Sequence, residues 1–339
     1  MRRCEPSLIP LWLGGTALMV AVMVALGGMT RLTGSGLSMV EWNPHHLLPP
    51  LTEDEWQSAF ALYRQSPEYR LVNAGLDLAG FKGIFWLEYV HRLWGRLIGL
   101  AFAAPLALFA LKGAIDRRLG LRLLLVLALG ALQGGIGWYM VASGLADRPE
   151  VSHYRLALHL LTAVLILMAL VWTALDVGTA HARPAPDARP ARRLLTALLA
   201  LALATLTWGA FVAGLHAGHV NTTFPLMDGG LFPRAGLALK PAWRNALENP
   251  AAVQYVHRVL AVTLLASLSL AALWARLARL PAAARRPILL AAAAAWAQVG
   301  LGIATLLLSV PVPLAVLHQM GAMTLVALLT WSLHGVRSG

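Results

Sequence analysis

The stretch that decides the fold is residues 81–96, FKGIFWLEYVHRLWGR, which opens a long apolar run. Within nine residues it places a carboxylate, an imidazole and two guanidiniums, those of Glu88, His91, Arg92 and Arg96. Such groups are costly in lipid, so they usually face the interior of a helix bundle and have a function there. We therefore expect a membrane protein whose chemistry lies inside a bundle.

The composition supports this expectation. Of the 339 residues, 58% are hydrophobic and 12% charged, and the mean hydropathy is +0.67. The net charge of +12 does not indicate a nucleic-acid partner, because the basic residues fall between apolar runs and form no stripe with interleaved aromatics. Membrane lipid is the expected surrounding. The single cysteine, Cys4, excludes an intrachain disulfide, and Arg2 and Arg3 before an apolar run resemble a signal anchor.

Eight stretches are long and apolar enough to cross a bilayer as helices. They predict an all-α integral membrane protein whose two termini lie on one side. The predicted spans are roughly 10–29, 83–111, 123–142, 155–176, 194–214, 255–275, 288–309 and 315–335.

The connecting loops predict the orientation. Loops 112–122, 177–193 and 276–287 carry twelve Lys or Arg in forty residues, and the opposite loops carry far fewer for their length. By the positive-inside rule both termini are therefore cytoplasmic.

Two long loops lie on the opposite, outer side. Loop 30–82 contains a capping-box pattern at Thr52–Glu55, followed by Trp56, Phe60 and Tyr63 at helical spacing. This pattern predicts an amphipathic helix on the outer face. Loop 215–254 has weaker helical signals and could form a lid.

The chain contains an internal repeat. Tyr89–Arg92 recurs as Tyr255–Arg258, and Gln133–Gly137 is matched by Gln298–Gly302, at offsets of 166 and 165 residues. Two matches at nearly one offset predict two pseudo-symmetric four-helix bundles, related as parallel repeats by an axis along the membrane normal. The predicted domains are residues 1–182 and 183–339.

Four histidines lie in the even-numbered spans at similar distances from their cytoplasmic ends: His91, His159, His257 and His318. They are therefore expected at one depth near the outer face, paired within each half. Two imidazoles from two helices can ligate the opposite axial positions of one heme iron. The alternative is that each is a hydrogen-bonded packing residue, which four histidines in register make less favoured.

Arg92 and Arg258 each follow a candidate ligand, where a guanidinium could meet a heme propionate. Among the other histidines, His153 is an alternative ligand at the outer boundary of the fourth span. Solvated or interfacial roles are expected for His45, His46, His181, His216, His219 and His334. His216 and His219 could bind a metal ion, but the sequence indicates no third ligand.

The repeat breaks at Glu88, whose counterpart is Gln254. Residues three apart share a helix face, so Glu88 is expected beside the His91 site as a titratable group, whereas Gln254 can only form hydrogen bonds. One half is thus equipped for proton chemistry and the other for holding a cofactor. The alternative is that Glu88 merely pairs with Arg92.

Several stretches resemble heme A synthase, in its cysteine-poor alphaproteobacterial and mitochondrial type. They are Phe81–Arg96, Thr30–Ser38, Trp42–Pro50 and Phe224–Met227, and the likeness extends over essentially the whole chain. The resemblance implies a membrane enzyme that oxidises the C8 methyl of heme O to the formyl of heme A for cytochrome oxidase. It also implies that His216 and His219 stand in a loop where the family has no histidines.

The resemblance also assigns roles to the site residues. It implies that His91 and His159 flank the substrate heme O, that His257 and His318 ligate a heme b cofactor, and that Glu88 matches the catalytic glutamate. If both axial positions of the substrate are occupied, removal of electrons and protons from the methyl, with Glu88 as base and water as oxygen source, is the simpler route.

The implied location is a bacterial inner membrane with the heme sites near the periplasmic face. Heme O synthase and cytochrome oxidase assembly factors are candidate partners, and a homo-oligomer is left open. A non-catalytic cytochrome b-type electron carrier is the main alternative, but it gives no reason for Glu88. A metal or proton transporter would need a polar path, yet the inner halves of the even spans are almost entirely apolar.

Overall fold

The computed structural model describes residues 8–41, 48–145, 149–178, 189–278, 280 and 282–336. Within these ranges the chain is helical and contains no named strand. Eight helices are long and apolar enough to span a membrane, which confirms the predicted all-α membrane fold. They are α1 (Leu8–Leu32), α4 (Leu78–Leu111), α5 (Arg117–Ala142), α6 (His153–Gly178), α7 (Arg189–Gly214), α9 (Pro250–Leu277), α10 (Ala282–Leu307) and α11 (Val312–Gly335).

All eight spans begin earlier than hydropathy predicts. The largest differences, of five or six residues, are at α4, α5, α7, α9 and α10, which begin at Leu78, Arg117, Arg189, Pro250 and Ala282 rather than at about 83, 123, 194, 255 and 288. The Asp77 side chain accepts a hydrogen bond from the backbone of Gly80, and the Asn249 side chain accepts bonds from the first turn of α9. Polar caps fix where a helix begins, whereas hydropathy marks only its lipid-facing part.

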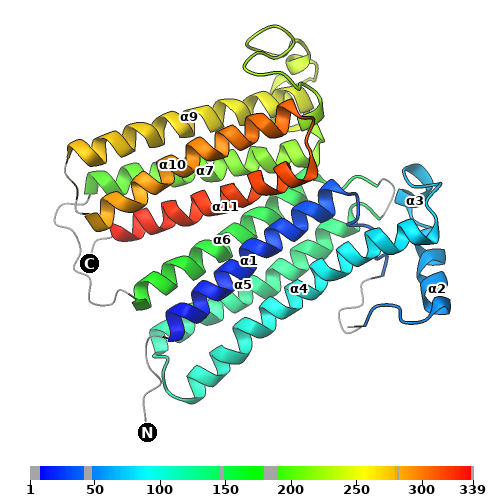
Figure 1. The fold of residues 1–339 in the computed structure, drawn as a ribbon, viewed down its shortest axis with the longest axis horizontal. Helices are drawn as coiled ribbons and strands as arrows, with labels where there is room; N and C mark the ends of the chain where they lie inside the picture. The colour runs from blue at the N-terminus through cyan, green and yellow to red at the C-terminus, as the bar shows by residue number, and fades with distance from the viewer. Residues whose placement is uncertain are drawn as a thin grey trace.

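The eight helices form two four-helix bundles that lie side by side (Figure 1). In the first bundle α1 and α5 each pack against α4 and α6, and in the second α7 and α10 each pack against α9 and α11. The same neighbours therefore recur in both halves, as the repeat predicts. The proposed domain boundary at residues 182 and 183 lies outside the described ranges.

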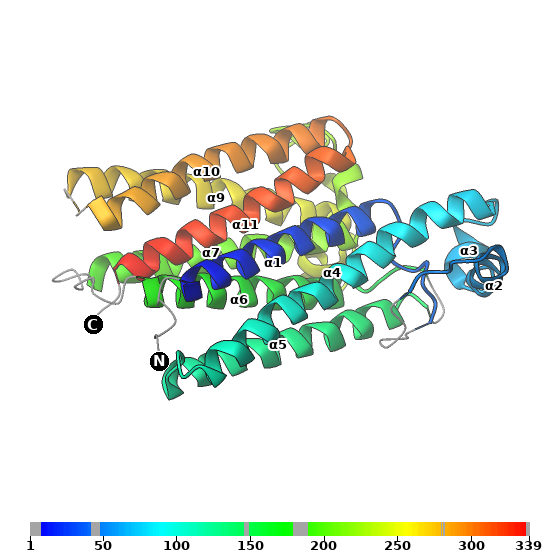
Figure 2. The ribbon, with the colours of Figure 1, turned by 60° about the horizontal axis from the view of Figure 1, so that its bottom comes forward.

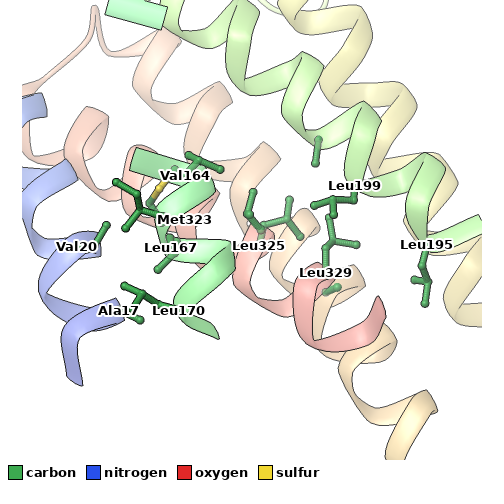
Figure 3. Close-up of a cluster of buried hydrophobic side chains, with 14 of the residues drawn as sticks. Ala17, Val20, Val164, Leu167, Leu170, Leu195, Leu199, Met323, Leu325 and Leu329 are labelled. Carbon is green, nitrogen blue, oxygen red and sulfur yellow. The ribbon is translucent and has the colours of Figure 1, made fainter. Parts of the chain in front are cut away.

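The two bundles meet through α1, α6, α7 and α11 (Figure 2). The contacts across this interface are α1 with α11, α6 with α7, and α6 with α11. If the repeat exchanges the two halves, the contact of α1 with α11 becomes the contact of α7 with α6. The contact of α6 with α11 maps onto itself. The main hydrophobic core lies along this interface (Figure 3), and it includes Ala17, Val20, Val164, Leu167, Leu170, Leu195, Leu199, Met323, Leu325 and Leu329.

The short elements gather at one end of the molecule, opposite the start of α1 and the end of α11 (Figure 1). We call this the outer end. It carries α2 (Glu53–Tyr63), α3 (Pro67–Leu71), and the η1–η3 and α8 turns at residues 217–219, 234–237, 242–244 and 245–248. Both hydrogen bonds of the predicted capping box at Thr52 are present.

The helix α2 docks on the outer part of α4. Trp56 and Tyr63 are buried, and the Phe60 and Tyr63 rings lie 5.2 and 5.1 Å from the ring of Phe81. The predicted amphipathic helix is therefore confirmed. We call α2, α3 and residues 78–89 the outer lobe.

Candidate functional site

The four histidines come from four helices, two in each bundle. His91 lies on α4 and His159 on α6, and His257 lies on α9 and His318 on α11. The His257 and His318 ring centroids are 6.5 Å apart, with the ring planes at 87°. Two metal–nitrogen bonds of about 2 Å each and two ring radii of about 1.1 Å add up to about 6 Å. The second pair is therefore spaced to hold one metal ion between its rings.

Each of these imidazoles rests against a glycine of a neighbouring helix. A Cβ atom added to that glycine would stand 2.8–3.2 Å from a ring atom, closer than packed atoms normally approach. A methyl group at any of these glycines would push the imidazole from its place, most of all at Gly302. The pairs are Gly27–His91, Gly137–His159, Gly209–His257 and Gly302–His318.

Sequence reasoning missed this role of the glycines. Gly137 and Gly302 end the repeated Gln–Gly segments, which was a signal that could have identified them. Gly27 and Gly209 stand in a part of the repeat with little identity. Their common role becomes apparent only from the packing.

Backbone hydrogen bonds set the tautomers of the second pair. The Nδ1 atom of His257 lies 3.1 Å from the Thr205 carbonyl oxygen, and that of His318 lies 3.2 Å from the Gln298 carbonyl oxygen. A carbonyl only accepts, so each Nδ1 carries the proton and each Nε2 keeps its lone pair. Metal-ligating histidines usually donate their other ring N–H to a backbone carbonyl in this way, which fixes the orientation of the ring.

The first pair lacks part of this support. In both bundles a glutamine amide donates to the backbone of a candidate ligand, Gln133 to the His159 carbonyl at 2.9 Å and Gln298 to the His318 carbonyl at 2.7 Å. However, the Nδ1 atom of His159 is buried without a hydrogen-bond partner in the described part of the chain. Hydrogen bonds thus fix the ring orientation of His159 less completely than that of His318.

Glu88 is buried, and both of its carboxylate oxygens are engaged. Oε2 accepts hydrogen bonds from the Ser38 hydroxyl at 2.6 Å and the Met39 backbone at 2.8 Å. Oε1 accepts from Arg92 at 2.6 Å. Arg92 also donates to the carbonyls of Met39 and Glu41. The ion pair that the sequence left as an alternative is therefore present, and it holds the loop after α1 against α4.

The second bundle repeats this arrangement without the carboxylate. Gln254 donates to the Asn221 carbonyl at 3.0 Å, and Arg258 donates at 2.8 Å to the carbonyls of Asn221 and Thr223. Asn221 and Thr223 correspond to Met39 and Glu41 at an offset of 182 residues. Gly209 follows Gly27 by the same offset. The repeat therefore includes the loop after the first helix of each bundle, where sequence identity is too low to reveal it.

The same offset relates Gly34 to His216. Both lie in the left-handed region, with φ of 65° and 50°. The His216 Nε2 atom lies 2.8 Å from an Arg31 guanidinium nitrogen. Arginine only donates, so Nε2 accepts. Burial and the Arg31 charge lower the pKa of His216.

Other histidines have separate surroundings. His153 begins α6 and packs against Tyr154 and Phe211, with ring centroids 4.0 and 5.3 Å away. His219 is exposed. In the described ranges no three His, Cys, Asp or Glu side chains gather as a metal ion would need. His45, His46 and His181 lie outside the described residues.

His334 differs from the prediction of a solvated or interfacial role. It is 4% exposed, and its Nε2 atom lies 3.0 Å from the Asp176 carboxylate, which also accepts from Arg122 at 2.6 Å. The inner ends of the spans are therefore less apolar than we predicted from the sequence. The prediction failed because hydropathy treats residues near a span end as solvated, and it cannot detect a partner on another helix.

The chain resembles known proteins over nearly its full length. A family model described as cytochrome oxidase assembly protein, COX15-CtaA, matches residues 10–330. A heme A synthase of Paramagnetospirillum magneticum is 48% identical over 333 residues, covering 96% of this chain and 93% of that protein. One of Rhodospirillum centenum is 49% identical, covering 98% and 89%. One of Nitrosospira multiformis is 45% identical, covering 97% and 93%.

Proposed function

The chain belongs to the COX15-CtaA family of cytochrome oxidase assembly proteins, and we propose on this premise that it is a heme A synthase. It oxidises the C8 methyl group of heme O to the formyl group of heme A, for use in cytochrome oxidase. The observation that carries the proposal is the repeated pair of imidazoles, one pair in each bundle, with every ring seated on a glycine. Two pairs suit a reaction that needs a substrate heme and an electron carrier.

The second bundle, within residues 183–339, is the cofactor site. His257 and His318 would hold heme b through their Nε2 atoms, and three observations support the fit: the 6.5 Å ring separation, the glycine seats and the preset tautomers. When bound, heme b supplies one-electron transfer. Arg258 follows a ligand and is the candidate contact for a propionate.

The first bundle, within residues 1–182, is the substrate site. Heme O lies there between His91 and His159. The unpartnered Nδ1 atom of His159 suits a substrate ligand, since a heme that must leave as product is better held by a less rigidly supported ring. Arg92 is the candidate propionate contact, and such a contact would compete with its bonds to the loop after α1.

Glu88 is the general base. Each round of oxidation removes two electrons and one proton from the methyl carbon and adds hydroxide from one water, whose other proton is released, first giving a hydroxymethyl group. The two electrons would leave one at a time through the cofactor site to an external acceptor. A second round gives a geminal diol, which loses water to form the aldehyde. To take a proton, Glu88 must exchange at least one present hydrogen bond for the substrate, so either the Ser38–Met39 segment or Arg92 has to move aside.

The expected setting is a bacterial inner membrane with the outer end in the periplasm. The basic loops at the opposite end of the bundle support this orientation, with both termini cytoplasmic. Heme O synthase is the natural supplier of the substrate, and cytochrome oxidase assembly factors are natural receivers of the product. A homo-oligomer is compatible with this arrangement.

Pigment extraction tests the proposal. The protein is purified in detergent from a host that makes heme O, and the extracted hemes are identified by chromatography and mass spectrometry. Heme b together with heme O, its hydroxylated form or heme A is expected. If heme b alone is found, the protein would be a cytochrome b-type electron carrier and not a synthase. A preparation without heme would reject both proposed heme sites.

A further inference from the structure

The loop after α7 meets α9 at a cluster of buried polar atoms that have no hydrogen-bond partner in the described part of the chain. The cluster consists of Asn221 Nδ2, Gln254 Oε1 and Arg258 Nε. The Asn221 and Gln254 residues are 5% and 2% exposed. Buried polar atoms are nearly always hydrogen-bonded, so such a cluster indicates that a group from outside the chain completes it.

One carbonyl group holds the three side chains together. The Asn221 carbonyl oxygen accepts from Gln254 Nε2 at 3.0 Å and from a terminal nitrogen of Arg258 at 2.8 Å. The other terminal nitrogen of Arg258 donates to the Thr223 carbonyl oxygen at 2.8 Å. Because a carbonyl oxygen only accepts, the Gln254 amide group is fixed with Oε1 as its free atom. The unpartnered atoms therefore belong to groups that the fold already holds in place.

The first bundle shows what the second one lacks. At the equivalent place Glu88 accepts from Arg92 at 2.6 Å and from the Met39 backbone at 2.8 Å. In the second bundle Gln254 replaces Glu88, and Asn221 replaces Met39. The second bundle has thus lost the carboxylate and gained a side-chain N–H donor at the same place.

The loss of the carboxylate leaves Arg258 without a counterion. Arg92 is paired with Glu88, whereas among the described residues no carboxylate forms an ion pair with Arg258. A buried atom of a charged group is costly unless an opposite charge or a hydrogen bond compensates it. An anionic ligand would remove this cost.

The unpartnered atoms favour a carboxylate as that ligand. Arg258 Nε and Asn221 Nδ2 are both N–H donors, and hydrogen bonds from a guanidinium to a carboxylate are short and strong. A single water could meet all three atoms, but it would leave the charge of Arg258 uncompensated. A carboxylate meets both donors and the charge, and a water beside it suits Gln254 Oε1.

The place of the cluster indicates where the carboxylate comes from. Gln254 stands three residues before His257 and Arg258 one residue after it, so the cluster lies within about one helical turn of this proposed heme ligand. The carboxylates of a heme are its two propionates. We propose that Asn221 Nδ2 and Arg258 Nε bind a propionate of heme b and so hold the cofactor in the second bundle.

The inference rests on the proposed function and deepens it. The first bundle has no side-chain donor in the place of Asn221, and its Arg92 is already paired with Glu88. Its heme would therefore be held less firmly, as suits a substrate that leaves as product. Asn221 thus helps to distinguish the resident heme from the exchanging one.

Retention of heme b tests the inference. The protein is purified in detergent from a host that makes heme b and mixed with an excess of a heme-free globin, and the rate of heme b loss is followed by absorption. Asn221→Leu, which is similar in size but lacks the donor, should raise the rate about 10-fold, as expected for loss of a hydrogen bond to a charged group. Asn221→Asp should raise it further, because a second carboxylate repels the propionate.

A modified heme separates this role from a structural one. The emptied protein is refilled with heme b or with its dimethyl ester, in which neither propionate is charged. The unmodified protein should prefer heme b by about 10-fold or more, and Asn221→Leu should lose most of this preference. Thr222→Val, a matched control on the neighbouring loop residue, should behave like the unmodified protein in both measurements.

An Asn221→Leu protein that loses heme b at the unmodified rate, or that keeps the full preference for heme b over the ester, would overturn the inference and leave a water as the occupant. If Asn221→Leu does not fold, Asn221→Asp decides, and an unmodified rate of loss there overturns the inference. If the unmodified protein holds no heme b, the proposed cofactor site fails and the inference fails with it. If retention changes as expected but a host that supplies heme O gains no heme A, only the proposed synthase activity fails.

Discussion

At the scale of single residues, one substitution distinguishes the two halves. Glu88 and Gln254 occupy equivalent places, and each bonds to the loop after the first helix of its bundle. The hydrogen bonds around Glu88 and Gln254 are alike, and in the second bundle an amide holds the loop. The carboxylate of Glu88 is therefore not needed to hold the loop in the first bundle. We therefore expect the negative charge of Glu88 to have a chemical role rather than a structural one.

Replacing Glu88 by Gln tests that reason. The amide should keep the loop and the hemes in place, because Gln254 does so in the second bundle, but it cannot accept a proton. We expect heme A formation to fall by about 10²–10⁴-fold, the usual range for loss of a general base, with heme O or its hydroxymethyl form accumulating. Chromatography of extracted hemes measures this, and a normal heme A yield would exclude Glu88 from the reaction.

Single histidine variants should separate the two sites. His318→Ala should remove heme b and leave heme O bound, whereas His159→Ala should do the reverse, because the two residues belong to different bundles. His153→Ala is the matched control, since that ring packs on Tyr154 and Phe211. Heme stoichiometry of the purified variants decides. Loss of heme from His153→Ala with retention in His159→Ala would exchange their roles.

At the scale of secondary-structure elements, close approach of helices positions the four histidines. Each histidine-bearing helix lies against a helix that presents a glycine to the imidazole, and the arrangement occurs four times. A side chain at these positions would displace the ring rather than merely tighten the packing. The helices of each bundle are thus positioning elements as well as membrane anchors.

Gly302→Ala tests this on α10. The added methyl would stand 2.8 Å from the His318 ring, and overpacking of this kind costs about 1–3 kcal/mol. We expect heme b affinity to fall about 10-fold and the heme absorption spectrum to shift. Gly300→Ala is the control, because its Cβ would meet nothing within 4 Å. Equal spectra and heme content for the two variants would contradict the view that Gly302 leaves the space that the His318 ring needs.

At the scale of the whole molecule, the two bundles are joined by an apolar interface, by the Arg31 hydrogen bonds at the outer end and by a polar cluster at the inner end. The Asp176 carboxylate of α6 contacts Arg122 of α5 and His334 of α11, so a single group connects helices of both bundles. Its distance from the outer end makes a structural role the natural one. A fixed relation of the bundles would keep the proposed substrate and cofactor sites at a constant separation.

Asp176→Asn should weaken this connection. Breaking a buried charge pair costs about 3–5 kcal/mol, but Asp176 and Arg122 are partly exposed, so we expect about 1–2 kcal/mol. The thermal unfolding midpoint in detergent measures it. Lys82→Gln, which removes the exposed pair with Glu53, should cost less than about 1 kcal/mol. An Asp176→Asn protein as stable as the unmodified one would show that the inner polar cluster adds nothing to the stability of the bundle interface.

The sequence by itself determined the membrane class, the eight spans, the two-bundle repeat and the α2 cap. These follow from hydropathy, local polar signals and matched segments, which are properties of neighbouring residues. It also singled out the four histidines and Glu88 as candidates, and their proposed roles as ligands and base stay predictions.

Only the tertiary structure decided which atoms these residues meet. The glycine seats, the Nδ1 bonds of the second pair, the Glu88 contacts with Ser38 and Met39, and the burial of His334 all join residues far apart in the chain. Glu68 is the clearest case, because in the sequence it is an ordinary loop carboxylate. Its burial, which raises its pKa to about 7, arises only when α2 and α3 pack at the outer end of the molecule, since packing rather than composition sets the local dielectric.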